Sequence, residues 1–371
     1  MIQSAVSTVA ALCFNFFTEA AMKNTVRRER GTALSVRNGC AKRIVLSFVV
    51  VAFAVCGVFA KENPKAASYV SHQTQDASAP IVYFTRDISA AGMLRVYQAM
   101  GWTATGKTGV KISTGEPPAS NYLRPALLKD TVQKVGGTIV ECNTAYGGSR
   151  ASNAMHKQVA KDHGFLTIAA FDLLDEDGSM LIPVPGAKRL TKGDYVGSRF
   201  KNYDSFLVIS HFKGHAMAGF GGAIKNLSIG FASGQGAKDS GKVYIHSGGT
   251  RTQGSIWGDQ IPFLESMAEA AKAVCRYMNG GKNIAFINVL NRLSVDCDCD
   301  GNPQEPDMHD IGILASTDPL AIDQAAVDLV YGAKDSGSLI ERIESRQGLH
   351  TLDYAAGIGL GKRTYRLTEI R

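Results

Sequence analysis

The chain has 371 residues, of which 45% are hydrophobic and 20% are charged, so it can bury a large core and is not a disordered protein. Its net charge is +7, but residues 1–60 hold seven Lys and Arg against two Glu, so most of the positive excess lies at the N-terminus. The rest of the chain is nearly balanced, which argues against a nucleic-acid partner.

An apolar stretch, Ile44–Ala60 (IVLSFVVVAFAVCGVFA), follows Lys42 and Arg43. Basic residues before a short apolar run that ends in small residues are typical of a secretory signal peptide. We interpret it as a signal cleaved before Lys61, with an uncleaved anchor as the alternative, because 17 residues are at the short limit for spanning a bilayer. The sequence thus predicts export to the periplasm or cell envelope, without membrane contact beyond residues 1–60.

Residues 61–80 are polar and lack hydrophobic periodicity, as is typical of a flexible lead-in. From Ile81 onward, apolar strand-like runs alternate with segments of helical periodicity. In the first half we expect strands at 81–85, 109–113, 138–143 and 166–172, and helices at 90–100, 123–136 and 150–164. This alternation predicts an α/β fold with a mostly parallel sheet flanked by helices. Functional groups are then expected at the carboxyl ends of strands.

The second half continues the pattern. We expect strands at 205–210, 283–290 and 311–316, helices at 262–280 and 319–332, and a Lys-, Ser- and Gly-rich passage at 233–254. A single α/β domain would therefore cover residues 81–371. Two lobes, 81–200 and 201–371, with a cleft between them are one arrangement that this pattern permits.

One motif is misleading. Residues 101–108 (GWTATGKT) match the GxxxxGK[ST] phosphate loop of nucleotide triphosphatases. That loop binds phosphate when a strand precedes it and a helix follows it. Here a helix is expected before it and a strand after it, so we interpret Lys107 as a solvated loop lysine.

The apolar run SFLVIS ends in the motif SHFKGH, which places His211, Lys213 and His215 at the end of a strand. The imidazoles are candidate metal ligands and Lys213 is a candidate catalytic residue. Gly221 and Gly222 follow, and glycines let the backbone approach a bound ligand closely. The alternative is a tight structural turn with exposed polar residues.

Further polar residues follow this motif. Lys225 and Asn226 lie ten and eleven residues after His215, and Lys242 and His246 lie in the next polar passage. A lysine binds a carboxylate or phosphate as a point charge, and a buried lysine can also move a proton. We therefore expect Lys225 to be catalytic, with a solvated loop as the alternative for the 233–254 passage. The expected ligand-binding residues, which would hold a small anionic molecule, are Asn226, Gly221, Gly222, Lys242 and His246.

The segment DCDCDGNPQEPD, residues 296–307, has two interpretations as a metal site. As DxDxDG it imitates the calcium loop of an EF-hand, but both flanks are expected to be strands, and Pro303 lacks the N–H that the loop uses at this position. As CxC it offers the thiolates of Cys297 and Cys299, which suit zinc or iron. Such a site needs about four ligands. The expected metal ligands are His211, His215, Cys297, Cys299, Asp298 and Asp310.

Disulfides are the alternative use of the cysteines in an oxidising compartment. Cleavage of the signal would leave Cys142, Cys275, Cys297 and Cys299. Direct pairing of Cys297 with Cys299 would close a very tight ring, so it is the pairing that we expect least.

The expected strand 311–316 is followed by STDPLAID. Asp318 is placed to cap the helix that begins with Pro319, and capping alone accounts for it. Asp323 lies on the first turns of that helix and could point into the same cleft, so we include it among the candidate catalytic residues.

Three long motifs, SHFKGHAMAGFGGAIKNLSIG, DCDC and DIGILASTDPLAIDQAAVDLV, together resemble the domain-of-unknown-function 362 family of prokaryotic proteins. The resemblance runs from about Ile81 to about Ser338 and implies a shared core domain with a cleft at these motifs. Members are often described as iron–sulfur proteins because many carry a ferredoxin-like CxxCxxC insertion. This chain has no CxxC at that place, so a four-iron cluster is not expected.

These observations favour an exported metal-binding protein that acts as a metal-dependent enzyme, redox or lyase-like, on a small anionic substrate. The metal would be zinc or iron. Two alternatives stay open: a non-enzymatic cell-envelope protein that binds an anionic ligand, and a calcium-stabilised structural domain.

Overall fold

A computed structural model describes residues 68–234 and 237–371 of the chain. The predicted signal peptide or anchor lies outside the described residues. No described helix is long and apolar enough to cross a membrane. From Ser68 onward the described residues belong to one compact unit.

A sheet of eight strands runs through this unit in the order β12-β1-β11-β10-β7-β2-β3-β4. Every neighbouring pair is parallel except the two that involve β11, which runs antiparallel to both β1 and β10. The fold is therefore α/β with a mostly parallel sheet, as predicted. The strands are β1 (Ile81–Thr85), β2 (Thr108–Lys111), β3 (Thr138–Glu141), β4 (Phe171–Leu173), β7 (Ser205–His211), β10 (Ile284–Leu290), β11 (Gly312–Ser316) and β12 (Arg366–Glu369).

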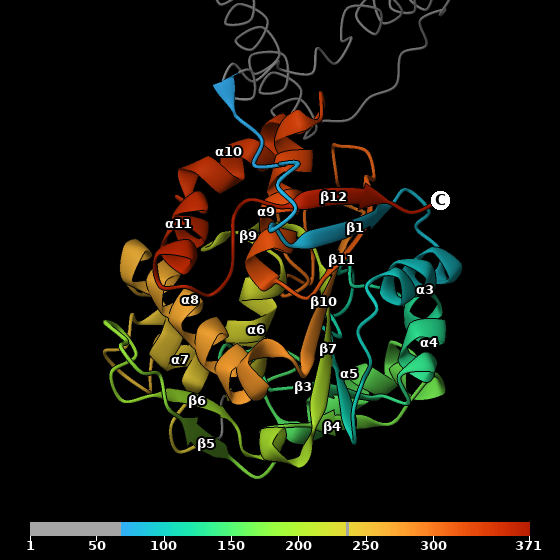
Figure 1. The fold of residues 1–371 in the computed structure, drawn as a ribbon. Helices are drawn as coiled ribbons and strands as arrows, with labels where there is room; N and C mark the ends of the chain where they lie inside the picture. The colour runs from blue at the N-terminus through green and yellow to red at the C-terminus, as the bar shows by residue number, and fades with distance from the viewer. Residues whose placement is uncertain (1–67, 235–236) are drawn as a thin grey trace, which may run out of the picture. The chain divides into compact units, whose positions relative to one another are not determined.

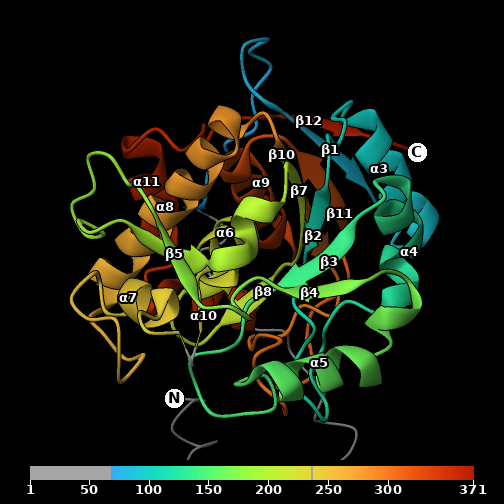
Figure 2. The same ribbon diagram turned by 90° about the horizontal axis from the view of Figure 1, so that it is seen from below.

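Helices cover both faces of the sheet (Figures 1 and 2). One face packs against α3 (Ala90–Ala99) and α4 (Pro125–Lys134), and α5 (Asn153–Asp162) lies beside β4. The other face packs against α6 (Ala223–Phe231), α8 (Gln260–Tyr277) and α9 (Pro319–Gly332). Three shorter helices complete the described part of the chain, namely α7 (Gly241–His246), α10 (Gly337–Ser345) and α11 (Leu349–Gly357).

Alternation along the central strand β7 explains why both faces need a helical layer. Phe206 and Val208 point into the core shared with α6 and α8, whereas Leu207 and Ile209 point into the core shared with α3 and α4. All seven residues of β7 are buried. A strand that is apolar on both sides is stable only when both sides are covered.

Several segments differ from the prediction, among them the helices α6, α10 and α11, which were not expected. The expected strand 166–172 is mostly a 3₁₀ turn, and only its end pairs in the sheet, as β4. A hairpin of β5 (Ser179–Ile182) and β6 (Asp194–Gly197) was not expected, because its strands are four residues long and too short for a period to show. Helix α7 lies in the polar passage, where Ser240 caps it by accepting from the N–H of Val243.

The GxxxxGKT segment joins α3 to β2, so a strand and not a helix follows it. Lys107 packs over the ring of Tyr203, 4.5 Å from its centroid. No phosphate loop is formed.

The polar segment 61–80 was expected to be a flexible lead-in, but its described residues are held by the domain. Tyr69 and Ser71 donate hydrogen bonds to the carboxylate of Asp328 on α9 at 2.8 and 2.7 Å. The N–H of Thr74 donates to the carbonyl of Tyr365 at 2.8 Å. Specific partners for the tyrosine and serine hydroxyls hold this segment, and composition alone does not reveal them.

Asp323 was expected to be catalytic. The structure places it on α9, with its carboxylate against the first residues of α6. Its carboxylate accepts from the N–H groups of Ala223 and Ile224 at 2.7 and 2.9 Å, and from Asn288 Nδ2 at 2.7 Å. A Cβ at Gly222 would lie 2.3 Å from this carboxylate, so glycine permits the close approach. Burial raises the pKa of Asp323 to about 6. The residue does not line the cavity described below and instead fixes the first turn of α6.

We expect the substitution Asp323→Ala to lower the free energy of unfolding by about 2 kcal/mol, because buried N–H donors lose their acceptor. Urea unfolding of the full chain measures this loss. The control is Asp130→Ala on the exposed surface of α4, for which a change within about 0.5 kcal/mol is expected. Equal effects of the two substitutions would contradict the capping role.

Candidate functional site

A cavity of about 540 Å³ lies where the carboxyl ends of three neighbouring parallel strands meet. Lys111 ends β2, Glu141 ends β3 and His211 ends β7, and all three line the cavity. In open parallel sheets this edge is where ligands bind. The remaining walls come from the β8–β9 hairpin (Lys213–His215 and Gly219–Gly221), α6, α7 and the CxC segment.

The structure brings most of the expected site residues together around this cavity. Asp310 and Asp323 do not line it. Asp310 is exposed, and its carboxylate accepts from the N–H of Arg292 at 2.6 Å. The expected residues that do line the cavity are His211, Lys213, His215, Gly221, Gly222, Lys225, Asn226, Lys242, His246, Cys297, Asp298 and Cys299.

A buried ion cluster fixes the CxC segment against the sheet. Asp298 accepts from Lys213 Nζ at 2.7 Å through one oxygen and from His211 Nδ1 at 2.8 Å through the other. Although burial alone would raise the pKa of Asp298, the charges of Lys213 and His211 hold it well below its usual range. The second nitrogen of His211 faces the carbonyl of Asn291 at 2.6 Å. Both nitrogens of His211 thus face acceptors, and neither offers a lone pair to a metal.

Cys297 and Cys299 form a disulfide, with Cα atoms 5.2 Å apart. This is the pairing that was least expected because it closes a very tight ring, and that expectation was wrong. The segment turns, since the N–H of Asp300 donates to the carbonyl of Cys297 at 2.9 Å. The turn brings the two sulfurs to one side. Cys142 and Cys275 are buried and free.

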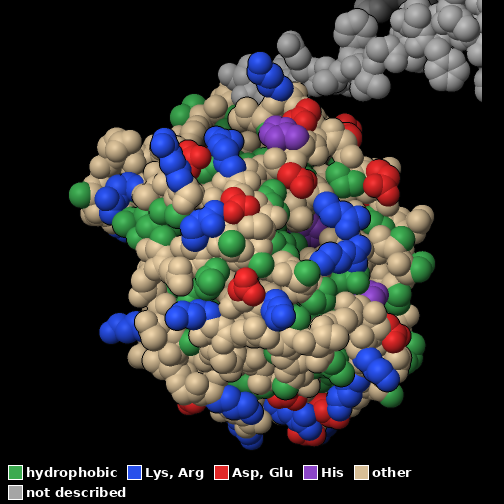
Figure 3. All heavy atoms as spheres, turned by 90° about the vertical axis from the view of Figure 1, so that its right-hand side faces the viewer, with side chains coloured by type: hydrophobic (Ala, Val, Ile, Leu, Met, Phe, Trp, Pro, Cys, Tyr) green, Lys and Arg blue, Asp and Glu red, His purple; other side chains and the backbone are tan. Residues whose placement is uncertain are grey.

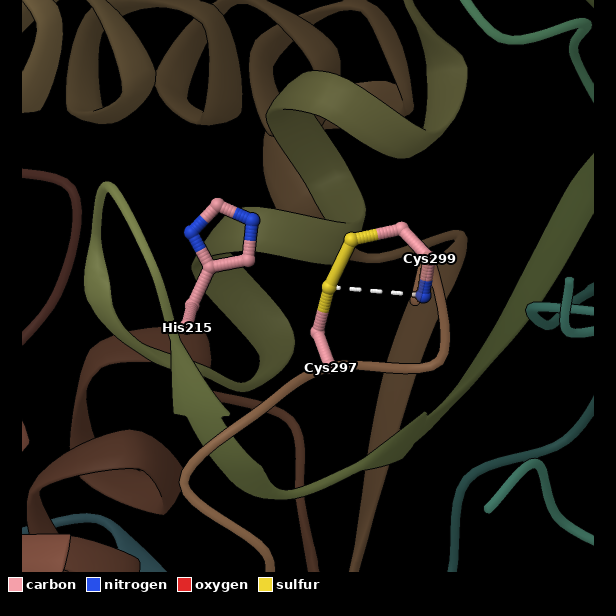
Figure 4. Close-up of side chains that lie close together, drawn as sticks. All are labelled: His215, Cys297 and Cys299. Carbon is pink, nitrogen blue, oxygen red and sulfur yellow. Dashed lines mark hydrogen bonds between the residues drawn. A yellow bond between two sulfur atoms is a disulfide. The ribbon is translucent and has the colours of Figure 1, made fainter. Parts of the chain in front are cut away.

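His215 lies beside this disulfide (Figure 4). A ligand atom of His215 and the two sulfurs all lie within 4.8 Å of one another, so this group could hold a metal ion. Strand β8 comes so near because residue 214 is glycine: a Cβ there would lie 2.3 Å from the carbonyl oxygen of Val295. The Nδ1 atom of His215 accepts from the N–H groups of Met217 and Ala218 at 3.2 and 2.9 Å.

The aspartates of the DxDxDG segment point to separate partners. Asp296 accepts from Arg342 and from the N–H of Gln304, and Asp300 accepts from the N–H of Asn302. Asp298 is held in the ion cluster. Strands β10 and β11, not helices, flank the segment. Within residues 68–234 and 237–371, no calcium-type cluster of three carboxylates forms here.

The cavity is rich in cations. Lys111 donates to the carbonyl of Ile112 at 2.5 Å and to Asn226 Oδ1 at 3.0 Å, and Lys242 donates to the carbonyl of Ala232 at 2.6 Å. Within the described part of the chain, Lys225 Nζ makes no hydrogen bond or ion pair. On the face shown in Figure 3, basic and acidic side chains are interspersed. The lining of the cavity, in contrast, holds four lysines and Arg150 against Glu141 and Asp298.

Burial lowers the pKa of these groups. Lys225 has its pKa lowered to about 7, by burial and then by the charge of Lys213. The pKa of Lys111 is lowered to about 8, mainly by burial. His246 donates through Nδ1 to the carbonyl of Lys242, and burial lowers its pKa to about 4. His215 is neutral, because burial and the neighbouring cations hold its pKa well below the usual value.

Sequence reasoning missed the groups that the first half contributes. The carboxylate of Glu141 accepts hydrogen bonds from the N–H and the hydroxyl of Thr114. Its Oε2 atom lies 2.9 Å from His156 Nε2, and its Oε1 atom lies 3.5 Å from Arg150 Nη1. Lys111 and Glu141 could have been found, because each is a charged residue at the carboxyl end of an apolar strand. Arg150 comes from a loop and carries no such signal.

Residues 108–328 match the family described as "Domain of unknown function (DUF362)". The chain belongs to this family. The match covers more than half of the chain and confirms the resemblance seen in the motifs. No curated protein matches the sequence.

The solved structures that are similar to this chain include the following two. The lactate racemase apoprotein from Thermoanaerobacterium thermosaccharolyticum is 18% identical, with a TM-score of 0.33 over 56% of this chain and 50% of that one. A Thermotoga maritima protein solved by a structural genomics consortium is 11% identical, with a TM-score of 0.38 over 66% of this chain and 57% of that one. This chain therefore matches about half the length of each.

The ion cluster leads to a prediction about stability. We expect Asp298→Asn to lower the free energy of unfolding by about 3 kcal/mol, because it leaves the buried Lys213 and His211 without their counter-charge. The control is Asp300→Asn, two residues away and exposed, for which a change of at most about 0.5 kcal/mol is expected. Chemical denaturation of both variants provides the comparison, and a neutral Asp298→Asn would refute the role of the cluster.

Proposed function

We propose that the protein is an enzyme that binds a small carboxylate- or phosphate-bearing molecule in the cavity and moves a proton with Lys225. The observation that carries this proposal is the state of Lys225. Its ammonium group lines the cavity, and among the described residues it has no hydrogen-bond or ion-pair partner. Lys225 is half-buried, and an unpaired cation that is partly removed from water is costly unless an anion joins it.

The other lysines strengthen this argument. Lys111 and Lys242 form no ion pair within the described chain and donate only to neutral oxygens. Their charges act on Lys225 and contribute to lowering its pKa. Like charges in a partly dehydrated site repel one another strongly, and a bound anion relieves that repulsion. Arg150 and Lys213 differ, because carboxylates neutralise them.

The pKa of Lys225 also suits it to acid–base chemistry. With a pKa of about 7, the side chain is populated both as an ammonium and as an amine near neutral pH. The amine can accept a proton from a bound molecule and the ammonium can return it. Groups with such a shifted pKa in a cavity are typical of catalytic sites.

Lys225 and Asn226 are well positioned for this role. They lie in the first turn of α6, which Asp323 caps. Asn226 also donates to the carbonyl of Ile209 and to Ser210 Oγ at 3.2 and 3.1 Å, which links α6 to strand β7. The ammonium group of Lys225 is thus held by a rigid helix start rather than by a loop.

The proposal includes export, which is supported by the apolar stretch Ile44–Ala60 and the basic residues before it. A non-enzymatic binding protein of the cell envelope would use the same lysines. Turnover separates the two possibilities: loss of affinity in Lys225→Gln without turnover of any carboxylate or phosphate compound by the wild-type chain would favour binding alone.

Anion affinity should depend on pH through Lys225. Sulfate stays a dianion across the range and prefers the ammonium form, so we expect its affinity to fall as pH rises through about 7. Lys111, with a pKa of about 8, extends the fall to higher pH. Lys225→Gln should weaken sulfate binding about tenfold at pH 6 and remove the step near pH 7.

Titration calorimetry of the full chain at pH 6 and pH 8.5 measures this effect. Lys201→Gln, an exposed lysine, is the matched control and should bind as the wild type does. The proposal fails if sulfate does not bind, or if Lys225→Gln binds it as tightly as the control at pH 6.

Metal dependence is a second candidate, favoured by the close approach of His215 to the two sulfurs. Reduction of the disulfide would free two thiolates, and thiolates with an imidazole suit zinc or iron. The other expected ligands, His211, Asp298 and Asp310, are engaged elsewhere. Such a site would have three protein ligands and an open position toward the cavity.

This candidate predicts that the full chain, reduced under anaerobic conditions, retains one zinc ion per chain after gel filtration. The oxidised chain and Cys297→Ser should retain none, whereas Cys275→Ser should behave as the wild type does. Elemental analysis of the filtered protein gives the ratio. Absence of stoichiometric metal in the reduced chain would remove metal dependence.

A further inference from the structure

The disulfide forms part of the wall of two cavities. Cys297 and Cys299 line the lysine-rich cavity, and they also line a second cavity of about 340 Å³ on the side of Glu116, Pro117 and Gly301. A disulfide with a purely structural role does not need to be accessible from two cavities. The sulfurs border two spaces that a small molecule can enter.

The two sulfurs have different surroundings. Cys299 is half-buried, whereas Cys297 is buried. The N–H of Cys299 donates to Cys297 Sγ at 3.3 Å. An attacking thiolate therefore reaches Cys299 more easily, and the thiolate that leaves on Cys297 already has a hydrogen-bond donor.

His215 places a second N–H group near the two sulfurs. Its Nδ1 accepts two backbone N–H groups, so the proton of the neutral ring is on Nε2. Figure 4 shows this Nε2 edge turned toward the disulfide. A metal at the same place would need a lone pair on Nε2, so the proton would have to move to Nδ1, which would then lose its two N–H donors. The hydrogen bonding of His215 therefore favours a developing thiolate over a metal ion.

We infer that Cys297 and Cys299 are a redox-active pair, and that the anion of the cavity is a small thiol, or its disulfide, that bears a carboxylate. This inference rests on the proposed function, because the lysines recognise the carboxylate. Lys225 and Lys242 hold the anionic end of the molecule while its sulfur meets Cys299. The same cations stabilise the thiolates that form during the exchange.

The exchange balances with two equivalents of thiol. A first thiolate attacks Cys299 Sγ, the bond to Cys297 breaks, and its electron pair leaves on Cys297 Sγ. A second thiolate attacks the sulfur of the bound thiol in the mixed disulfide, and Cys299 leaves as a thiolate. Two thiols become one disulfide, while the protein pair takes up two electrons and two protons. The reverse sequence reduces an anionic disulfide.

The free cysteines do not fit this role. Cys142 lines the same cavity, but burial raises its pKa, and its thiol donates to the carbonyl of Phe231. Burial raises the pKa of Cys275 to about 12. A thiol that is kept protonated is a poor nucleophile.

The experiment compares two thiols of equal length on the oxidised full chain, 3-mercaptopropionate and 3-mercaptopropan-1-ol. Reduction is quenched by alkylation, and the peptide that contains both cysteines is quantified by mass spectrometry. With rates expressed per thiolate, we expect the carboxylate thiol to react about tenfold faster. Lys225→Gln should bring that ratio close to one, whereas Lys201→Gln and Cys275→Ser should keep it.

Two outcomes would overturn the inference. One is a bridge that both thiols reduce only after denaturant is added, and the other is a wild-type ratio of one. If sulfate still binds with its dependence on Lys225, the proposed function stands and the exchange alone fails. Both of these outcomes are measured on the wild-type chain, so they do not depend on how the variants fold.

Discussion

The buried carboxylate of Asp298 is the interaction on which the candidate site depends. It joins His211 and Lys213, which end one strand and begin the next, to the CxC segment more than 80 residues later. A buried carboxylate is tolerated because both of its oxygens have charged partners. The two cysteines adjacent to Asp298 are thereby held against strand β8. Their sulfurs lie beside His215 as a consequence, and the wall of the cavity is closed there.

The cations of the cavity fall into two classes: those that are paired with a carboxylate and those that are not. Lys213 and Arg150 are neutralised by Asp298, Glu116 and Glu141, so they shape the walls without attracting an anion. The unpaired lysines come from β2, α6 and α7, which surround the space from different sides. Their fields add inside the cavity, where partial burial strengthens them. This arrangement supports the proposal that the cavity binds an anion.

Much of the fold could be predicted from the sequence, because long apolar strands and amphipathic helices carry clear periods. The His- and Cys-bearing motifs could be placed together since both follow strands of one sheet. Several features were not predicted: α7 is too short to show a period, the helices α6, α10 and α11 were not expected, and Arg150 lies in a loop. The disulfide depends on a turn closed by the N–H of Asp300. The role of Asp323 was missed because this residue lies on α9 but caps α6. The sequence does not reveal that these two helices are in contact.

The lysines and the sulfurs impose the same electrostatic requirement. A bound carboxylate, a mixed disulfide with its departing thiolate and a reduced dithiol all add negative charge to one cavity. Each is favoured by the ammonium groups of Lys111, Lys225 and Lys242, and by the N–H donor of neutral His215. Oxidation of the pair removes that charge and leaves Lys225 without a partner, with its pKa near 7. In the proposed exchange, the redox state of the pair and the proton on Lys225 are therefore coupled, because reduction adds negative charge that favours the ammonium form.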